Sequence, residues 1–283
     1  MFGFLNIYKP QGKTSHDVVA VLRRITKIKQ IGHTGTLDPF AEGVLPICIG
    51  KATRLIEYLE DDKAYIGTVQ LGKSTTTYDT EGEGVNSSDK KVTLEDIETV
   101  LPKFRGEIQQ LPPIYSAIKV NGKKLYEYAR KGEEVKIEPR RVNIYNLEVV
   151  NFNEEKQTLD LHIECSKGTY IRSIAHDLGE ALGCWGHLIK LVRIKAGKFE
   201  INESIKLDSL DTVEQVEKNL IYPLEYLNYP KYELSDSEKE KVSHGMGVNT
   251  NLENGIALLT QQNKLIAVAN IENKKAKILK VFI

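Results

Sequence analysis

The chain has 283 residues, of which 41% are hydrophobic and 28% charged, proportions typical of a folded soluble protein of one or two domains and not of a disordered chain. The 39 basic and 39 acidic side chains leave no formal net charge, which excludes a globally basic nucleic-acid-binding protein. No apolar run reaches the ~18 residues that a membrane-spanning helix needs, and the first residues lack the pattern of a secretory signal.

The first seventy residues show a helix, a glycine-rich stretch and a strand. Thr14 to Asp17 fit a capping box, and the apolar residues that follow recur at helical spacing as far as Ile28. Residues 32–50 are punctuated by glycine, and residues 52–59 have a short helical pattern. Residues 65–71 alternate as a strand, with Gly67 expected to leave room beside the Tyr65 ring.

The next segments predict a loop, a helix and an insertion. Residues 72–92 are polar and predict a loop, and Thr93 begins a helix. Four apolar side chains are expected to face inward from that helix: Leu94, Ile97, Leu101 and Phe104. Residues 108–138 are predicted to form an insertion, with a hairpin turn at Asn121-Gly122 and a short helix from Leu125 that stops near Gly132.

The second half of the chain predicts two strands, one helix and a small β-rich module. Residues 142–150 and 159–165 have strand patterns, and a clean helical stripe runs from Ile171 to Leu182. From Tyr229 onward only short strand patterns remain apparent, at residues 256–260, 265–271 and 276–283, which predicts an all-β module. The expected domains are therefore residues 1–228 and 229–283.

Charge is unevenly distributed along this neutral chain. Residues 1–30 carry six basic side chains and one acidic one, and residues 116–141 carry eight basic and four acidic. Residues 200–245 carry eleven acidic and five basic side chains. Local basic patches can steer a polyanion to one face of a neutral protein, although ordinary solvated surface would give the same counts.

Asp38 has two readings from local sequence. Glycines at 32, 35 and 43 let the backbone form loops that a ligand can approach closely, and Pro39 holds Asp38 in an extended conformation. Asp38 followed by Pro39 is equally a common helix start, with the carboxylate as N-cap and the proline at N1. Local sequence alone leaves both a chemical and a capping role open.

Arg172 and Tyr65 are the other candidates, and each also has a structural reading. Residues 167–172 lie where a strand enters a helix, so a cation there favours an anion, either a phosphate or a carboxylate. Arg172 could instead form a structural ion pair. Tyr65 could present its ring to a planar ligand or simply fill the core.

Other kinds of site are not indicated. Residues 67–74 match the phosphate-loop pattern, but the four central residues are themselves the strand and no helical pattern follows, so nucleotide hydrolysis is not predicted. The six histidines lack metal-ligand spacing. Cys48, Cys165 and Cys184 are too few for a disulfide framework and indicate a reducing, cytoplasmic setting.

Four segments in chain order resemble the TruB family of tRNA pseudouridine synthases. The run from Gly32 to Gly43 (GHTGTLDPFAEG) resembles that family's catalytic motif, and Lys9–Ser15 (KPQGKTS) resembles its KPxGxTS segment. Residues 113–130 are similar to its RNA-gripping thumb, and Ser166–Arg172 matches its SKGTYIR segment. The C-terminal strands resemble its PUA module. The resemblance runs from about residue 2 to 200 and implies an α/β fold with a mixed, largely antiparallel central sheet flanked by helices.

The resemblance also implies the function and the roles of residues. It implies isomerisation of uridine 55 in the T loop of tRNA, with Asp38 as nucleophile, Arg172 paired with it and Tyr65 stacked on the base. Three routes are open for Asp38: attack on C1′, addition to C6, or elimination through a glycal. Further substrate contacts are implied at the following positions: His33, Tyr170, Leu191, Lys9 and Arg193. His33 would help to hold the RNA loop with its base extruded, and Tyr170 and Leu191 would line the uracil pocket. The motif that contains Lys9 is also implied to support the fold near the site. No cofactor, metal, membrane or protein partner is expected, and a monomer is expected. The alternative is a non-catalytic RNA-binding or RNA-folding protein on the same scaffold.

Overall fold

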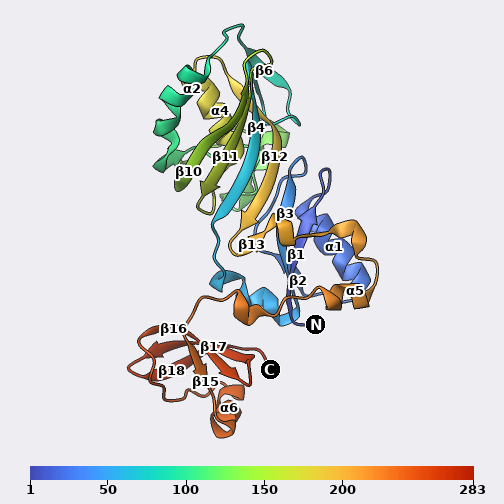
Figure 1. The fold of residues 1–283 in the computed structure, drawn as a ribbon, viewed down its shortest axis with the longest axis vertical. Coiled ribbons are helices and arrows are strands. Elements are labelled where there is room, and N and C mark those ends of the chain that lie inside the picture. Colours follow the sequence, from blue (N-terminus) through green and yellow to red (C-terminus); the bar gives the residue numbers. More distant parts are fainter.

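The computed structural model describes residues 1–283 and is built on a ten-stranded mixed sheet (Figure 1). The main strand order is β14-β1-β3-β12-β4-β11-β10-β7, with β2 beside β3 and β13 beside β12. Only the β1–β14 and β3–β12 pairs are parallel, which confirms the mixed, largely antiparallel sheet. The strands are β1 (Gly3–Lys9), β2 (Ile31–His33), β3 (Glu42–Ile49), β4 (Lys63–Leu71), β7 (Gly106–Gln110), β10 (Arg140–Asn153), β11 (Thr158–Cys165), β12 (Gly186–Ala196), β13 (Phe199–Glu200) and β14 (Ile205–Lys206).

The helices belong to different parts of the chain. The capping box predicted at Thr14 is present, with the Thr14 side chain accepting from the Asp17 amide. The α-helices are α1 (Ser15–Thr26), α2 (Leu94–Val100), α3 (Leu125–Lys131), α4 (Ile171–Ala181), α5 (Val213–Lys218) and α6 (Asp236–Ser243). Helices α1, α4 and α5 belong to the part of the chain that contains the main sheet, whereas α3 lies in the 108–138 segment and α6 packs on the C-terminal sheet. The 3₁₀ helices are η1 (Gly50–Tyr58), η2 (Leu101–Phe104), η3 (Ile201–Glu203), η4 (Leu207–Ser209) and η5 (Pro223–Glu225), so the short helix predicted at 52–59 is a 3₁₀ helix.

The two halves of the sheet meet where β12 passes β3. The parallel pairing of these two strands covers only two residue pairs, Val192 with Glu42 and Arg193 with Gly43. Gly43 has φ +110°, and a Cβ there would lie 2.3 Å from the Arg193 carbonyl oxygen. Glycine is required at this position because the two backbones approach closely. The loop that precedes Gly43 carries Asp38, so this seam fixes the place of that loop.

The insertion predicted at residues 108–138, called the excursion below, contains the expected hairpin and helix. Strands β8 (Lys119–Val120) and β9 (Lys123–Lys124) are joined through Asn121 and Gly122, both with positive φ, and α3 follows at once. Gly132 ends α3 in a left-handed conformation. The first residues of the predicted insertion belong instead to β7, at the edge of the main sheet.

Two expectations for residues 72–104 are wrong. Residues 72–92 are not only loop, because β5 (Lys73–Thr75) pairs with β6 (Gly84–Ser87). The buried residues of β5 are the polar Ser74 and Thr75, so the segment has no apolar pattern. Leu94 does not face inward: it is 47% exposed, whereas Ile97 and Leu101 are fully buried. The first turn of α2 projects beyond the core, so only the later apolar positions reach it.

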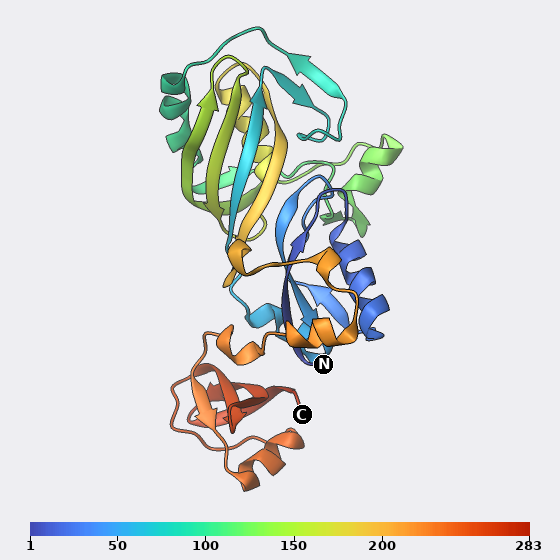
Figure 2. The ribbon, with the colours of Figure 1, turned by 45° about the vertical axis from the view of Figure 1, so that its right-hand side comes forward.

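The C-terminal residues form a second sheet (Figures 1 and 2). Its order is β15 (Lys231–Glu233), β16 (Gly255–Gln261), β17 (Lys264–Glu272) and β18 (Lys275–Val281). The expected β-rich module is confirmed, but it is not all β, because α6 packs there. That helix has one buried residue, Val242, and so gave no apolar stripe. The boundary at 228/229 stays a prediction.

The C-terminal sheet is joined to the larger part through an apolar contact. The Phe282 ring lies 5.6 Å from the Phe2 ring, and the Arg54 guanidinium lies over Phe282. Leu258 and Leu265 share a core cluster with Phe4.

None of the helices has the length and apolar character needed to cross a bilayer.

Replacing Gly179 with alanine should destabilise the fold although alanine is the better helix former. A Cβ at Gly179 of α4 would lie 2.1 Å from the backbone nitrogen of Gly186, where β12 begins. Overpacking of this kind typically costs about 1–3 kcal/mol. Thermal and urea unfolding measure the loss, with Gly32→Ala as control because its Cβ would meet nothing closer than 3.8 Å. Equal stability of the two variants would contradict the close approach.

Candidate active site

A cleft of about 700 Å³ opens at the seam between the two halves of the sheet. Segments far apart in the sequence line it: the loop of residues 34–39, strand β4, the turn at residues 77–81, the excursion of residues 115–130, the entry to α4, and β12. It brings together five of the residues predicted from sequence: Asp38, Tyr65, Tyr170, Arg172 and Leu191. Three others, His33, Lys9 and Arg193, are not among its lining residues.

Asp38 lies on a turn and does not cap a helix. The Ala41 amide donates to the Asp38 carbonyl at 3.1 Å, and β3 begins at Glu42, so the capping interpretation is wrong. The β3–β12 seam leaves no room for a helix after Pro39, because the chain must enter β3 within three residues. The Asp38 side chain is 32% exposed and lines the cleft.

Buried polar groups behind the cleft hold the Asp38 loop. The Lys9 ammonium is fully buried and donates to the carbonyls of Lys13, at 2.6 Å, and Pro39, at 3.4 Å. Arg193 is 1% exposed and donates to the carbonyls of Val44, at 2.7 Å, and Gly35, at 3.1 Å. Both cations therefore support the loop through its backbone. Their predicted contact with substrate stays a prediction.

Arg172 joins the loop to α4 and to the turn at 77–81. Its Nε lies 2.9 Å from Asp38 Oδ2, and its Nη1 lies 3.3 Å from Asp79 Oδ2. The guanidinium also donates to the carbonyls of Thr77, at 3.0 Å, and Tyr115, at 3.1 Å. Arg172 is 4% exposed, so four partners from three segments fix one planar group.

Asp79 was not identified from sequence. It is 2% exposed, and its carboxylate accepts from the Thr77 hydroxyl and, at 2.9 Å, from the Glu81 amide. The residue stands in a polar segment that was predicted as a plain loop. The only sequence signal was one acidic residue in a stretch rich in threonine and glycine. Such stretches are too common to identify Asp79 as a site residue.

The electrostatics of Asp38 are set by opposing effects. Burial in the cleft raises the pKa of the Asp38 carboxyl, the nearby Arg172 guanidinium opposes that rise, and the Asp79 carboxylate adds to it. Burial has the largest effect, so the pKa of Asp38 lies above its usual value. The carboxylate is therefore a stronger base and nucleophile than one in water.

Tyr65 and Leu191 form an apolar wall of the cleft. They are 6% and 5% exposed. Burial raises the pKa of Tyr65 to about 12, so the phenol is neutral at physiological pH. The space beside Gly67 is taken by Leu188 and Ile171, which approach a Cβ position there to 3.2 and 3.5 Å, and is not open beside the Tyr65 ring as expected.

His33 lies in β2, at the start of the loop. Its Nδ1 is buried without a hydrogen-bond partner, and burial lowers the pKa of its imidazole. The ring is therefore neutral at pH 7. The role predicted for it in holding an extruded base stays a prediction.

The phosphate-loop match has no phosphate-loop structure, as predicted. Residues 67–71 are strand β4 and Lys73–Thr75 is strand β5, so no helix N-terminus faces a bound phosphate. All three cysteines are free and buried.

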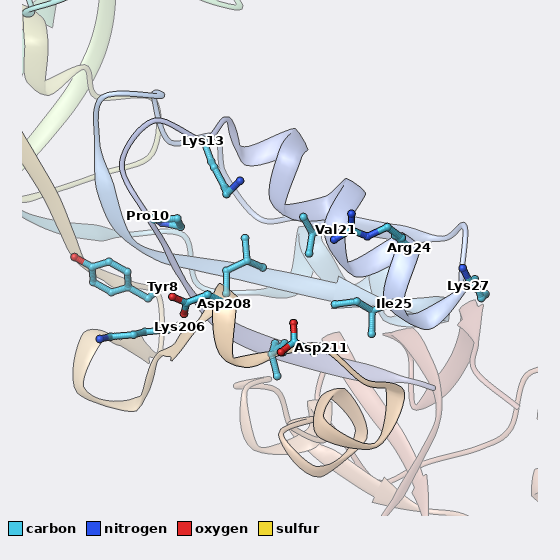
Figure 3. A pocket seen from close by; sticks show the side chains of 12 residues that line it. Tyr8, Pro10, Lys13, Val21, Arg24, Ile25, Lys27, Lys206, Asp208 and Asp211 are labelled. Atoms are coloured by element: carbon cyan, nitrogen blue, oxygen red, sulfur yellow. The ribbon is translucent and has the colours of Figure 1, made fainter.

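A second cavity of about 740 Å³ lies between α1 and residues 206–211 (Figure 3). Basic side chains of Lys13, Arg24 and Lys206 line it together with the acids Asp208 and Asp211. None of the predicted site residues lines this cavity, so the cleft beside Asp38 is the candidate active site.

Comparison with known proteins gives one consistent family. Residues 23–171 match the family model described as TruB family pseudouridylate synthase (N terminal domain), and residues 172–227 match the tRNA pseudouridylate synthase B C-terminal domain. The tRNA pseudouridine synthase B of Caldanaerobacter subterraneus subsp. tengcongensis is 43% identical, covering 99% of each chain. That of Francisella philomiragia subsp. philomiragia is 42% identical, covering 96% of this chain and 92% of the relative.

Solved structures resemble the whole chain. A chain of a Cbf5-Nop10-Gar1 complex has a TM-score of 0.73 at 27% identity, covering all of this chain and 85% of the other. A chain of an H/ACA RNP bound to a substrate RNA containing 2'-deoxyuridine has a TM-score of 0.72 at 25% identity, with the same coverage. The likeness extends through the C-terminal sheet.

Proposed function

Because the chain belongs to the TruB family of pseudouridine synthases, we propose that it isomerises uridine to pseudouridine in tRNA, at position 55 of the T loop. Relatives above 40% identity over nearly their full length carry the name tRNA pseudouridine synthase B, which supports the reaction and the tRNA substrate. The position in the T loop is the finer part of the proposal.

One observation carries the assignment to the cleft. Asp38 and Arg172 face each other at 2.9 Å in a cleft that also holds the Tyr65 ring. A surface that only bound RNA would gain nothing from a half-buried carboxylate, since that group repels phosphates and is costly to desolvate. The pair therefore favours an isomerase over the alternative of a non-catalytic RNA-binding protein.

In the proposed reaction, the Asp38 carboxylate attacks or stabilises the ribose of the target nucleoside, and Arg172 keeps the Asp38 side chain ionised. Breaking the bond between uracil and ribose C1′ builds positive charge on the sugar, which a carboxylate can stabilise or capture covalently. Uracil then turns and rejoins the ribose through C5, and any bond between C1′ and the Asp38 carboxylate breaks as the new bond forms. C5 loses a proton and N1, which has lost the sugar, gains one, so the sum is an isomerisation. Nothing is oxidised or hydrolysed in the sum, so the reaction calls for no cofactor.

Tyr65, Leu191 and Tyr170 are proposed to hold the extruded base. Taking a base out of its stack costs a few kcal/mol, and stacking on one aromatic ring returns about 1–3 kcal/mol. Tyr65 alone could roughly offset extrusion. The apolar wall keeps water away from the detached uracil.

The rim of the cleft is proposed to hold RNA phosphates. Lys63 and Lys167 line one part of it, and Arg130 on α3 lines another. The excursion that carries α3 thus reaches the cleft, which supports its predicted role in gripping RNA. Because phosphate contacts release counterions, affinity is expected to fall with salt. A monomer, a reducing cytoplasmic setting and RNA contacts from the PUA-like C-terminal module belong to the same proposal.

Purified protein with an unmodified tRNA transcript and no added cofactor should form pseudouridine at position 55. Chemical mapping of pseudouridine reads every uridine of the transcript at once. A transcript with cytidine at position 55 is the matched substrate control and should gain no modification. Absence of pseudouridine from the uridine transcript would contradict the reaction, and equal modification at other positions would contradict the site.

A further inference from the structure

The turn that holds Asp79 has an unusual backbone at Tyr78. Tyr78 has φ +64°, in the left-handed region that a tyrosine rarely adopts, and it lies between Thr77 and Asp79. Both neighbours contact Arg172, Thr77 through its carbonyl and Asp79 through its carboxylate. The strained residue is therefore the one that directs two of the four partners of Arg172.

The Tyr78 side chain stacks on a residue of α4. Its ring lies 3.8 Å from the His176 ring, centroid to centroid, with 9° between the planes. His176 is one helical turn beyond Arg172 on the same helix. The turn and α4 are thus joined twice, once through the guanidinium of Arg172 and once through the two rings.

The backbone contacts of Tyr78 leave the ring as its main attachment to α4. The Tyr78 carbonyl accepts from the Leu188 amide of β12 at 2.9 Å, and its amide donates to the Thr75 carbonyl at 3.2 Å. These bonds hold the turn to β12 and to itself. Only the stack joins Tyr78 to the helix that carries Arg172.

We propose that the Tyr78–His176 stack is a positioning device that holds the 77–81 turn against α4, so that Thr77 and Asp79 orient Arg172 toward Asp38. The inference rests on the proposed function. Tyr78 and His176 touch no reacting atom and act through Arg172. Carbon atoms in contact at about 3.5–4.0 Å gain dispersion energy, and the many such contacts in a close parallel stack oppose the strain of the left-handed residue.

The charged groups around the stack leave it neutral. Burial lowers the pKa of His176, while Glu180, whose Oε1 lies 3.5 Å from His176 Nε2, opposes that effect. Burial raises the pKa of the Tyr78 phenol, and the negative charges of Asp177 and Glu180 raise it further. A neutral imidazole therefore faces a neutral phenol at pH 7.

Removing either ring should slow the chemical step without weakening tRNA binding. Tyr78→Ala and His176→Ala are each expected to lower the single-turnover rate about 10- to 100-fold, because small displacements of catalytic groups have effects of this size. The Kd for tRNA should change less than about twofold, since the rim cations are untouched. Tyr78→Phe keeps the ring and should restore the rate, and the double alanine variant should be no slower than either single one.

The Tyr78→Gly variant distinguishes loss of the ring stack from a change in backbone strain at residue 78. Glycine adopts φ +64° without strain, so this variant should be as slow as Tyr78→Ala if the stack matters. A wild-type rate for Tyr78→Gly, or a slow Tyr78→Phe, would overturn the proposal. So would an unchanged rate in His176→Ala.

Hydrogen exchange gives a readout that does not depend on activity. Amides of residues 76–83 should exchange faster in Tyr78→Ala and His176→Ala than in the wild type and Tyr78→Phe, because the turn loses its attachment to α4. Equal exchange in all four proteins would overturn the positioning role whether or not the wild type forms pseudouridine. A wild type without activity but with the expected exchange pattern would contradict only the proposed function.

Discussion

Asp38→Asn is expected to abolish pseudouridine formation while tRNA binding persists. The amide keeps the size of the side chain but cannot meet or capture the positive charge that develops at C1′. Loss of a group that forms a covalent intermediate typically lowers the rate by about 10⁴-fold or more. Arg172 keeps Asp79 and the carbonyls of Thr77 and Tyr115, so the cleft should keep its shape. Tritium release from 5-tritiated uridine in tRNA measures turnover, and filter binding measures affinity.

The control for this variant makes the same chemical change outside the cleft. Asp208 lines the second cavity, so Asp208→Asn should turn over tRNA at the wild-type rate. Appreciable turnover by Asp38→Asn would remove its nucleophilic role. Loss of activity in both variants would indicate a general effect of charge instead.

The same Asp38→Asn variant should be more stable than the wild type at pH 7. Because burial raises the pKa of Asp38 in the folded state, the folded protein binds its proton more tightly than the unfolded chain does. The contribution of Asp38 to stability is therefore lost as pH rises from about 3.8 through the folded-state pKa. Asparagine stays neutral and avoids that loss. The thermal midpoints of the two proteins should accordingly diverge as pH rises from acid to neutral.

The sequence located most elements because their signals are local. Capping residues and helical spacing identified α1 and α4, and the Asn121-Gly122 turn identified the hairpin. Each depends on residues within one or two turns of chain. No apolar pattern marks β5, β6 and α6. The buried residues of β5 are Ser74 and Thr75, β6 has none, and α6 has only Val242.

The candidate site was only partly predictable for a different reason. Asp38 and Arg172 were found because the motifs around them resemble those of a known family, and local reasoning had left Asp38 open to a capping role. Asp79 acquires its role only when the 77–81 turn meets α4, and that contact depends on the fold. Lys9 lies in a motif expected to support the fold near the site, and its ammonium donates to backbone carbonyls behind the cleft, as does the Arg193 guanidinium.

Arg172→Lys should lower the single-turnover rate about 10²-fold or more although the charge is kept. A lysine ammonium is a compact, strongly hydrated point charge, and it cannot reach Asp38, Asp79 and two carbonyls with one planar fork. Arg172 lowers the pKa of Asp38, and a lysine should lower it less. The pKa of Asp38 should therefore be higher in the variant, and activity should begin to fall at a higher pH as the solution is acidified. Rates measured from pH 5 to 9 test both expectations. Arg24→Lys, an exposed exchange at the second cavity, should change neither.

The Asp79→Asn variant distinguishes the effect of Asp79 on the position of Arg172 from its effect on the pKa of Asp38. This change also removes one partner of the guanidinium, so the rate should fall. The Asp79 carboxylate raises the pKa of Asp38, however, so its neutralisation should move the acid limb of the pH profile to lower pH. Arg172→Lys and Asp79→Asn should therefore both be slow, with acid limbs displaced in opposite directions. If both limbs moved the same way, the activity at low pH would report a group other than Asp38.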